Sequence, residues 1–141
     1  MISIDTNVLL RYLLGDELRQ YRLAHETITT HQPALITDVV LVEAIWTLSG
    51  KRYGLDKAGV SNLIRALITD QLFVFENLQV VWSALQDYED AQTVRGKSLD
   101  FSDALIARKS VYTANAKGTA FKTFYSFDKA TEQLPLATLL T

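Results

Sequence analysis

The sequence contains no cysteine among its 141 residues. This absence excludes disulfide bonds, zinc sites built on thiolates and cysteine nucleophiles, and it fits a reducing compartment, so we expect a cytoplasmic protein. No stretch of the sequence approaches the roughly 18 uninterrupted apolar residues that a membrane-spanning helix needs, and no basic leader precedes an apolar run near residue 1. We therefore expect neither export nor a membrane partner.

Charge of one sign is not in excess either, because 14 basic residues stand against 16 acidic ones for a net charge of −2. Bulk charge alone therefore indicates no polyanionic partner. The length predicts a single domain over residues 1–141, since a typical domain has about 100 to 200 residues. With 48% hydrophobic and 21% charged residues, the composition predicts a packed core and excludes wholesale disorder.

Short apolar segments alternate with longer helical patterns along the chain. Strands are predicted at residues 2–4, 34–37, 73–75 and 120–125, with an edge strand within 134–140. Helices are predicted at about 8–14, 17–31, 38–49, 57–69, 77–90 and 100–115. This alternation predicts an α/β fold with three layers (α/β/α) around a central, mainly parallel sheet of four to five strands.

Several acidic residues come just after predicted strands or at a helix start. Asp5 follows the first strand, Asp128 follows the strand that ends near residue 125, and Asp103 opens a helix together with Asp100. In open parallel sheets the ligand crevice lies beyond the carboxyl ends of the strands, so these side chains are able to converge. Asp5 and Asp100 fit equally well as helix caps, and spacing alone does not separate the two interpretations.

Glu43 is the only charged residue in the apolar run from residue 39 to residue 48. We expect partial burial of its carboxylate, which then needs an opposite charge, hydrogen bonds or a metal ion. The sequence therefore predicts a cation facing Glu43, either a basic side chain or a metal.

A crevice that gathers Asp5, Glu43, Asp103 and Asp128 would hold four mutually repelling carboxylates, and a divalent cation would neutralise them. Oxygen ligands favour Mg²⁺ or Mn²⁺ over zinc. Magnesium held by carboxylates commonly positions phosphates and activates water, so a phosphodiester is the natural substrate. Without these four acids, 12 acidic residues remain against 14 basic ones, and a net +2 surface suits a polyanion.

Histidine is scarce. His25 and His31 do not have the spacing that places two side chains on one helical face, so we expect both at the surface and assign them no role. This placement disfavours a metal-independent ribonuclease that relies on histidines.

Four motifs follow one another along the chain. They are Ile-Asp-Thr-Asn-Val-Leu-Leu-Arg-Tyr-Leu from Ile4, Val-Glu-Ala around Glu43, Asp-Phe-Ser-Asp-Ala-Leu-Ile-Ala from Asp100, and Ser-Phe-Asp-Lys from Ser126. Together they resemble the PIN-domain ribonucleases, in particular the VapC toxins of bacterial type II toxin–antitoxin pairs. The first motif is fairly specific by itself, and the other three become specific in combination. The resemblance runs from residue 4 to residue 129 in the family order.

The resemblance implies a catalytic and metal-binding site for Mg²⁺ or Mn²⁺. Its acids would be Asp5, Glu43 and Asp103, with Asp128 as a fourth, and Asp100 would be either a further ligand or only a cap. Neighbouring polar side chains would orient the carboxylates or metal-bound waters, and these are Thr6, Asn7 and Ser126. The implied activity is metal-dependent hydrolysis of RNA, often a transfer or ribosomal RNA, by one or two ions, which inhibits translation.

The resemblance also implies partners, namely a homodimer and a small antitoxin that blocks the site, often with a basic side chain. RNA would be read by loops that contact unpaired bases. The basic and aromatic candidates for this contact are Lys51, Arg52, Tyr53, Arg95 and Lys97, while Arg11 would contact RNA phosphate or pair with an acid.

Two other classes of protein remain as alternatives. A PIN-like module without catalysis would bind RNA or protein through the same fold. A magnesium-dependent phosphatase or phospho-receiver domain also begins with a strand that ends in aspartate. The phosphatase, however, needs a second aspartate two positions later, where this sequence has Asn7.

Overall fold

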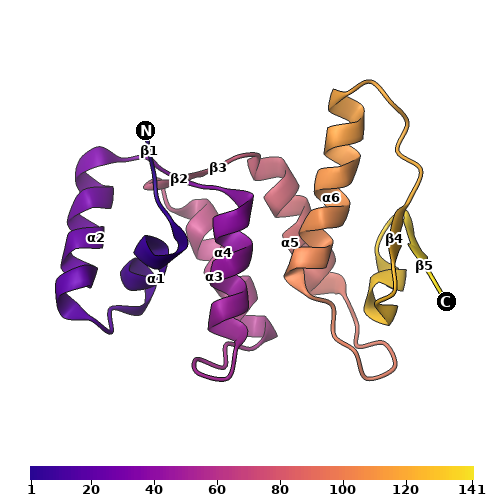
Figure 1. Cartoon of the computed structure of the whole chain (residues 1–141), viewed down its shortest axis with the longest axis horizontal. Helices are drawn as coiled ribbons and strands as arrows, with labels where there is room; N and C mark the ends of the chain where they lie inside the picture. The colour runs from indigo at the N-terminus through magenta and orange to yellow at the C-terminus, as the bar shows by residue number, and fades with distance from the viewer. The chain divides into compact units, whose positions relative to one another are not determined.

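The computed structural model describes all 141 residues, which form two compact units, Met1–Leu78 and Gln79–Thr141. The elements of the first unit are β1 (Ile2–Ser3), α1 (Thr6–Leu14), α2 (Leu18–His31), β2 (Ala34–Ile36), α3 (Asp38–Ser49), α4 (Lys57–Thr69) and β3 (Phe73–Phe75). The remaining elements are α5 (Leu78–Asp90), α6 (Phe101–Ala116), β4 (Phe124–Ser126), the 3₁₀ helix η1 (Lys129–Gln133) and β5 (Ala137–Leu139). Figure 1 shows the course of the chain through them.

The first unit contains a parallel sheet with strand order β1-β2-β3, in which Ala34 of β2 lies opposite both Ile2 of β1 and Phe73 of β3. Parallel neighbours need a crossover, and each crossover here is a pair of helices, α1 with α2 and α3 with α4. Helix α1 packs against both α2 and α3. The central strand contributes Ile36 to the core and α1 contributes Leu9, both fully buried.

The second unit combines two helices with a parallel pair of strands, in which Phe124 of β4 lies opposite Ala137 of β5. Helix η1 joins these strands and packs against β5. The fully buried side chains of Val81 and Leu85 give α5 its core face. Tyr88 of α5 meets Phe101, the first residue of α6, edge to face with 5.9 Å between the ring centroids.

The structure confirms the α/β class and the parallel pairing of all five strands. The strands lie in two sheets, three in the first unit and two in the second, where the sequence predicts one central sheet. Each strand has only two or three residues. The strand predicted over residues 120–125 is therefore shorter than expected: β4 begins at Phe124, and residues 120–123 lie outside it. The sequence patterns did not predict helix η1. No helix is long and apolar enough to cross a membrane.

An ion pair joins the two helices of the second unit. Arg108 of α6 donates two hydrogen bonds to the carboxylate of Asp87 on α5, with N to O distances of 2.6 and 2.8 Å. The side chain of Asp87 is 12% exposed and that of Arg108 is 35% exposed. The hydrogen bond from Arg108 to Asp87 raises the pKa of the Arg108 guanidinium, against the opposing effect of burial, so the guanidinium stays charged at physiological pH. This pair fixes α6 on α5.

We expect Arg108→Met to lower the free energy of unfolding by about 1 to 2 kcal/mol. A hydrogen bond to a charged group contributes about 1.5 to 3 kcal/mol where solvent is excluded, and partial exposure of the guanidinium screens part of that value. Urea denaturation measures the change. Arg22→Met is the matched control, because Arg22 is an exposed arginine of α2. Equal losses in the two variants would contradict a stabilising role for the Asp87–Arg108 pair.

Candidate functional site

Three carboxylates converge within the second unit. Asp100, Asp103 and Asp128 each offer one oxygen, and these oxygens all lie within 4.8 Å of one another. Two of the acids come from the start of α6, and the third lies between β4 and η1. Three carboxylates at this separation have the composition of a site for a divalent cation.

Asp100 occupies the N-cap position of α6 without capping it. Its backbone is extended (φ −78°, ψ 139°), but its carboxylate accepts no hydrogen bond from the helix. The side chain is exposed and belongs to the cluster. Of the two interpretations of Asp100, the geometry favours the ligand, because both carboxylate oxygens remain available.

Asp128 is held in place by its neighbours. Its backbone N–H donates to Oγ of Ser126 at 2.9 Å, and its Oδ1 accepts from the N–H of Ala130 at 2.9 Å. The hydroxyl of Thr131, which is fully buried, donates to the carbonyl of Asp128 at 2.6 Å. Ser126 therefore orients Asp128 through its backbone, and Oδ2 of Asp128 stays available to a ligand.

The electrostatics of the cluster are unfavourable for three free carboxylates. Burial raises the pKa of Asp103 above its usual range, and the negative charges of Asp100 and Asp128 raise it further. Asp103 lies in the first turn of α6, where the helix dipole favours a negative charge. The pKa is raised all the same, so repulsion and burial outweigh the dipole. A cation with oxygen ligands relieves both effects, and Mg²⁺ or Mn²⁺ fits this donor set.

Asp5 lies in the first unit and caps α1. Its Oδ1 accepts from the N–H of Val8 at 2.9 Å, while the residue as a whole is exposed. One carboxylate oxygen therefore serves as the cap, and the other remains open to solvent. Thr6 is half-buried and Asn7 is exposed, both in the first turn of α1.

Glu43 differs from the sequence prediction, because its side chain is exposed and forms no ion pair. The expectation of a buried carboxylate facing a cation within the protein was wrong. Helix α3 is apolar on nearly every side, yet it buries only the face that carries Val40, Leu41, Ala44, Ile45 and Leu48. Val39 and Trp46 lie on the same exposed side as Glu43, with 66% and 80% of their surfaces exposed. The apolar residues around Glu43 in the sequence therefore led to a prediction of more burial than its carboxylate has in the structure.

Two acids at the carboxyl end of the first sheet were missed by the sequence analysis. Asp38 follows β2 and Glu76 follows β3. The carboxylate of Glu76 accepts from the N–H of Asp38 at 2.6 Å and so holds the start of α3. The rule that selects Asp5, an acid directly after a strand, also selects these two residues, so the signal was present in the sequence.

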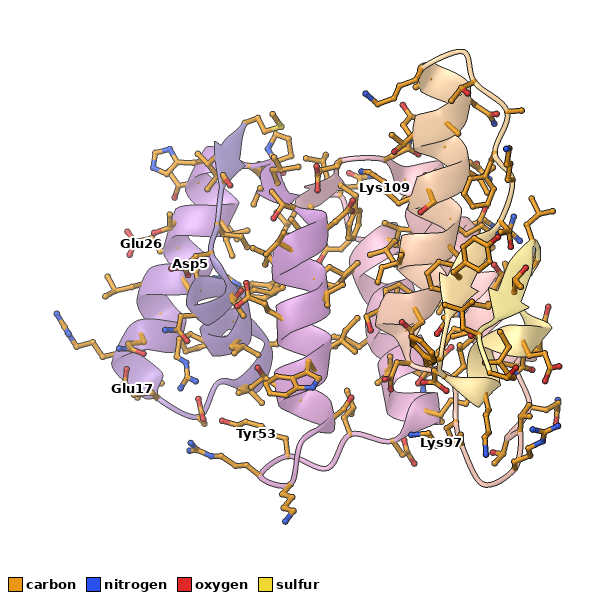
Figure 2. All side chains as sticks on the ribbon, turned by 45° about the vertical axis from the view of Figure 1, so that its right-hand side comes forward. Asp5, Glu17, Glu26, Tyr53, Lys97 and Lys109 are labelled. Atoms are coloured by element: carbon orange, nitrogen blue, oxygen red, sulfur yellow. The ribbon has the colours of Figure 1, made fainter.

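The basic candidates for RNA contact lie on three segments. Arg11 donates to Asp16 at 2.9 Å, which neutralises much of its charge. Lys51 and Arg52 are exposed in the loop after α3, and the guanidinium of Arg52 lies over the ring of Tyr53, 5.2 Å from the centroid. Figure 2 shows Tyr53 in this loop.

The loop before α6 is a tight hairpin. Val94 and Lys97 exchange backbone hydrogen bonds of 2.8 and 2.9 Å around Arg95 and Gly96, whose φ angles are 51° and 78°. Gly96 adopts the left-handed conformation freely, whereas Arg95 adopts it at a steric cost. The hairpin presents two exposed basic side chains a few residues before Asp100, and Figure 2 shows Lys97 there.

The two histidines are exposed, as predicted. His25 stacks on the ring of Tyr12, with 5.8 Å between the centroids. This contact gives His25 a packing partner on α1.

The parallel sheets, the crossover helices and the carboxylate cluster define an α/β protein with a site suited to a divalent cation. The PIN-domain family matches residues 2–135, and this chain belongs to that family. The match extends over both compact units. PIN domains are generally metal-dependent nucleases, so membership supports a nuclease-type activity. No curated protein and no solved structure matches the chain.

Proposed function

We propose that this protein is a Mg²⁺- or Mn²⁺-dependent endoribonuclease that hydrolyses phosphodiester bonds in RNA. The observation that carries the proposal is the convergence of Asp100, Asp103 and Asp128 in a chain that matches the PIN domain over residues 2–135. Phosphodiester hydrolysis is the chemistry for which proteins commonly use divalent cations on carboxylates.

In this proposal Asp100, Asp103 and Asp128 would hold the metal. Asp5 and Glu43 are also proposed to act in metal binding and catalysis. Asp5 and Glu43 are included because they occupy the acidic positions of the first two family motifs, and because both are exposed carboxylates. A bound divalent cation supplies Lewis-acid chemistry, since it polarises a phosphate oxygen and lowers the pKa of water.

The chain's own residues position this chemistry. Ser126 fixes the backbone of Asp128, and the Asp87–Arg108 pair fixes the helix that carries Asp100 and Asp103. Thr6 and Asn7 follow Asp5 directly and have the hydroxyl and amide groups needed to hold water or phosphate oxygens beside it.

The proposal extends to a toxin role, in which cleavage of transfer or ribosomal RNA inhibits translation. Arg52 with Tyr53 and the hairpin with Arg95 and Lys97 supply cations and an aromatic face for RNA loops. A cognate antitoxin neutralises the enzyme, and the enzyme forms a homodimer. The motif resemblance to VapC toxins supports both partners. The exposed Val39 and Trp46 on α3 are apolar surface of the kind that association buries.

The test is the cleavage of total RNA by antitoxin-free protein with Mg²⁺ or Mn²⁺, beside a chelated sample and Asp5→Asn. We expect discrete fragments that vanish on chelation and in the variant, because Asn keeps the shape and the cap but loses the charge. Asp56→Asn is a matched control: Asp56 is also an exposed N-cap aspartate, and its Oδ1 accepts from Gly59 N–H at 2.8 Å. This control should cleave normally.

Two results would count against the proposal. Fragments that persist after chelation and in Asp5→Asn would show that another site, or a contaminant, cuts the RNA. A folded protein that binds metal and RNA without cutting any RNA in the preparation would favour the PIN-like binding module.

A further inference from the structure

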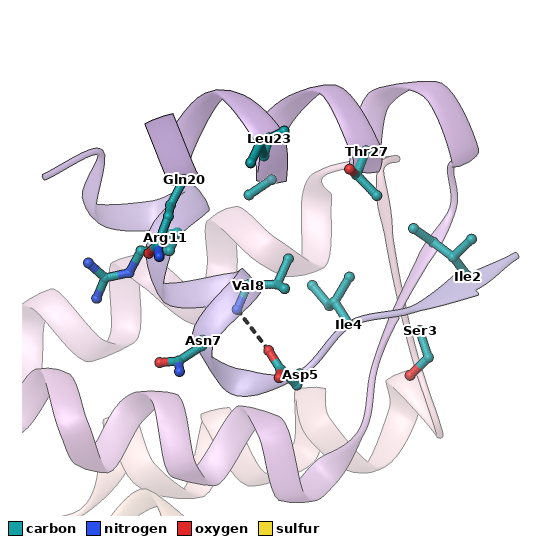
Figure 3. Close-up of a pocket in the computed structure, with 11 residues that line it drawn as sticks. Ile2, Ser3, Ile4, Asp5, Asn7, Val8, Arg11, Gln20, Leu23 and Thr27 are labelled. Carbon is teal, nitrogen blue, oxygen red and sulfur yellow. Dashed lines mark hydrogen bonds between the residues drawn. The ribbon is translucent and has the colours of Figure 1, made fainter. Parts of the chain in front are cut away.

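A pocket of about 520 Å³ lies in the first unit between β1, α1 and α2. Figure 3 shows it with Asp5 on its wall. The volume lies within the range of about 300 to 1,000 Å³ that is usual for small-ligand sites. The roles proposed above for Asp5 and Asn7, which line the pocket, leave most of its other lining residues without a function.

One end of the pocket is polar. Asn7 and Arg11 of α1 lie there with Gln20 of α2 (Figure 3). The side-chain amides of Asn7 and Gln20 form no hydrogen bond within the protein, so each keeps a donor and an acceptor for a ligand. The ion pair of 2.9 Å with Asp16 fixes the guanidinium of Arg11 at this end.

Most of the other side chains that line the pocket are apolar, although Ser3, Asp5 and Thr27 also border it. The apolar lining includes Val8 of α1, Leu23 and Ala24 of α2, and Ile4 just after β1, which is only 6% exposed. These side chains offer a surface for the faces of a flat, weakly polar molecule, while the amides at the other end can meet its edge.

The charges indicate which ligand class fits. Arg11 is already paired with Asp16, and Asp5 adds a negative charge to the wall, so a phosphate group would find no free cation in the pocket. A neutral heterocycle with donors and acceptors on its edge matches the amides instead. Asn and Gln are among the side chains that form paired hydrogen bonds with base edges, typically with adenine.

We propose that this pocket receives an unpaired RNA base, and that Gln20 reads the edge of that base. The inference rests on the proposed nuclease function for the identity of its ligand. Asp5 borders the pocket, so a base held there lies next to the acid that is proposed to act on the backbone. Gln20 is a specificity residue and takes no part in holding the metal.

The binding test uses the four ribonucleosides, which carry no phosphate, titrated into chelator-treated protein and followed by amide NMR. We expect one or two of them to bind and to shift signals of pocket residues such as Leu23 and Thr27. Gln20→Leu should lower the affinity for the preferred nucleoside by at least about fivefold, which is the low end of the contribution of one pair of base-edge hydrogen bonds. Gln79→Leu, an exposed glutamine of α5, is the matched control and should bind as the wild type does.

The cleavage test maps the bases that flank each cut in RNA incubated with Mn²⁺. We expect Gln20→Leu to relax the base preference at one flanking position, whereas Gln79→Leu, outside the pocket, should keep both the wild-type preference and the wild-type cleavage rate. The absence of nucleoside binding, or equal binding by the two glutamine variants, would overturn the subsite even if RNA is cut. Nucleoside binding that depends on Gln20, in a protein that cuts no RNA, would keep the subsite and reject the nuclease.

Discussion

Asp103→Asn is expected to reduce metal-dependent RNA cleavage by at least about a hundredfold, which corresponds to about 2.7 kcal/mol of transition-state stabilisation. Asp103 is half-buried, and the negative charges of Asp100 and Asp128 both act on it. The substitution removes one charge from the cluster at nearly constant shape, so the divalent cation loses a ligand charge in a half-buried position. Initial cleavage rates at saturating Mn²⁺ measure the loss.

The same substitution is expected to raise the melting temperature of the metal-free protein. The raised pKa of Asp103 means that its ionised form is disfavoured in the fold, and a neutral amide removes that penalty. A variant that is more stable yet inactive separates catalytic from structural damage. Asp90 is an exposed acid at the end of α5, and Asp90→Asn should change neither the cleavage rate nor the melting temperature. A stable Asp103→Asn protein with wild-type cleavage rates would reject the carboxylate cluster as the catalytic site.

Local signals in the sequence predicted most helix boundaries correctly. Asp5 and Asp56 are the N-caps of α1 and α4, and Gly15 ends α1 in the left-handed conformation. Helix α2 begins one residue later than predicted, with Glu17 as its N-cap and Asp16 paired with Arg11, whereas α3 begins at Asp38 as predicted, with Thr37 as its N-cap.

Tertiary contacts explain what the sequence alone could not decide about the site. A cap and a ligand both place an aspartate at a helix start. What favours a ligand role for Asp100 is the absence of a side-chain cap hydrogen bond together with the spatial approach of Asp128. The exposure of Glu43 depends on which side of α3 packs against the core, and a helix that is apolar all round does not encode that choice. Catalytic roles for Asp5, Glu43, Asp103 and Asp128 stay predictions, and Asp5→Asn and Asp103→Asn test two of them.

Mn²⁺ is expected to stabilise the wild-type protein by about 2.7 kcal/mol when its free concentration is a hundred times the dissociation constant, because it binds the folded state alone. For a chain of this length the corresponding rise in melting temperature is about 6 to 10 °C. Asp100→Asn and Asp103→Asn should lose most of this rise, since each removes a carboxylate from the cluster. Thermal unfolding followed by circular dichroism, with Mn²⁺ and with chelator, measures it.

The pH dependence of stability should have opposite signs with and without the metal. Without metal, Asp103 binds its proton more tightly in the folded than in the unfolded state, so its contribution to stability falls as pH rises from its usual pKa of 3.8 through the raised value. With Mn²⁺, which needs the ionised carboxylates, the stabilisation grows over the same window. Because other carboxylates also bind protons in this pH range, the quantity to compare at each pH is the difference in free energy of unfolding between the wild type and Asp103→Asn. A metal-induced stabilisation that is equal in both proteins, or that does not grow with pH, would place the metal away from these three aspartates.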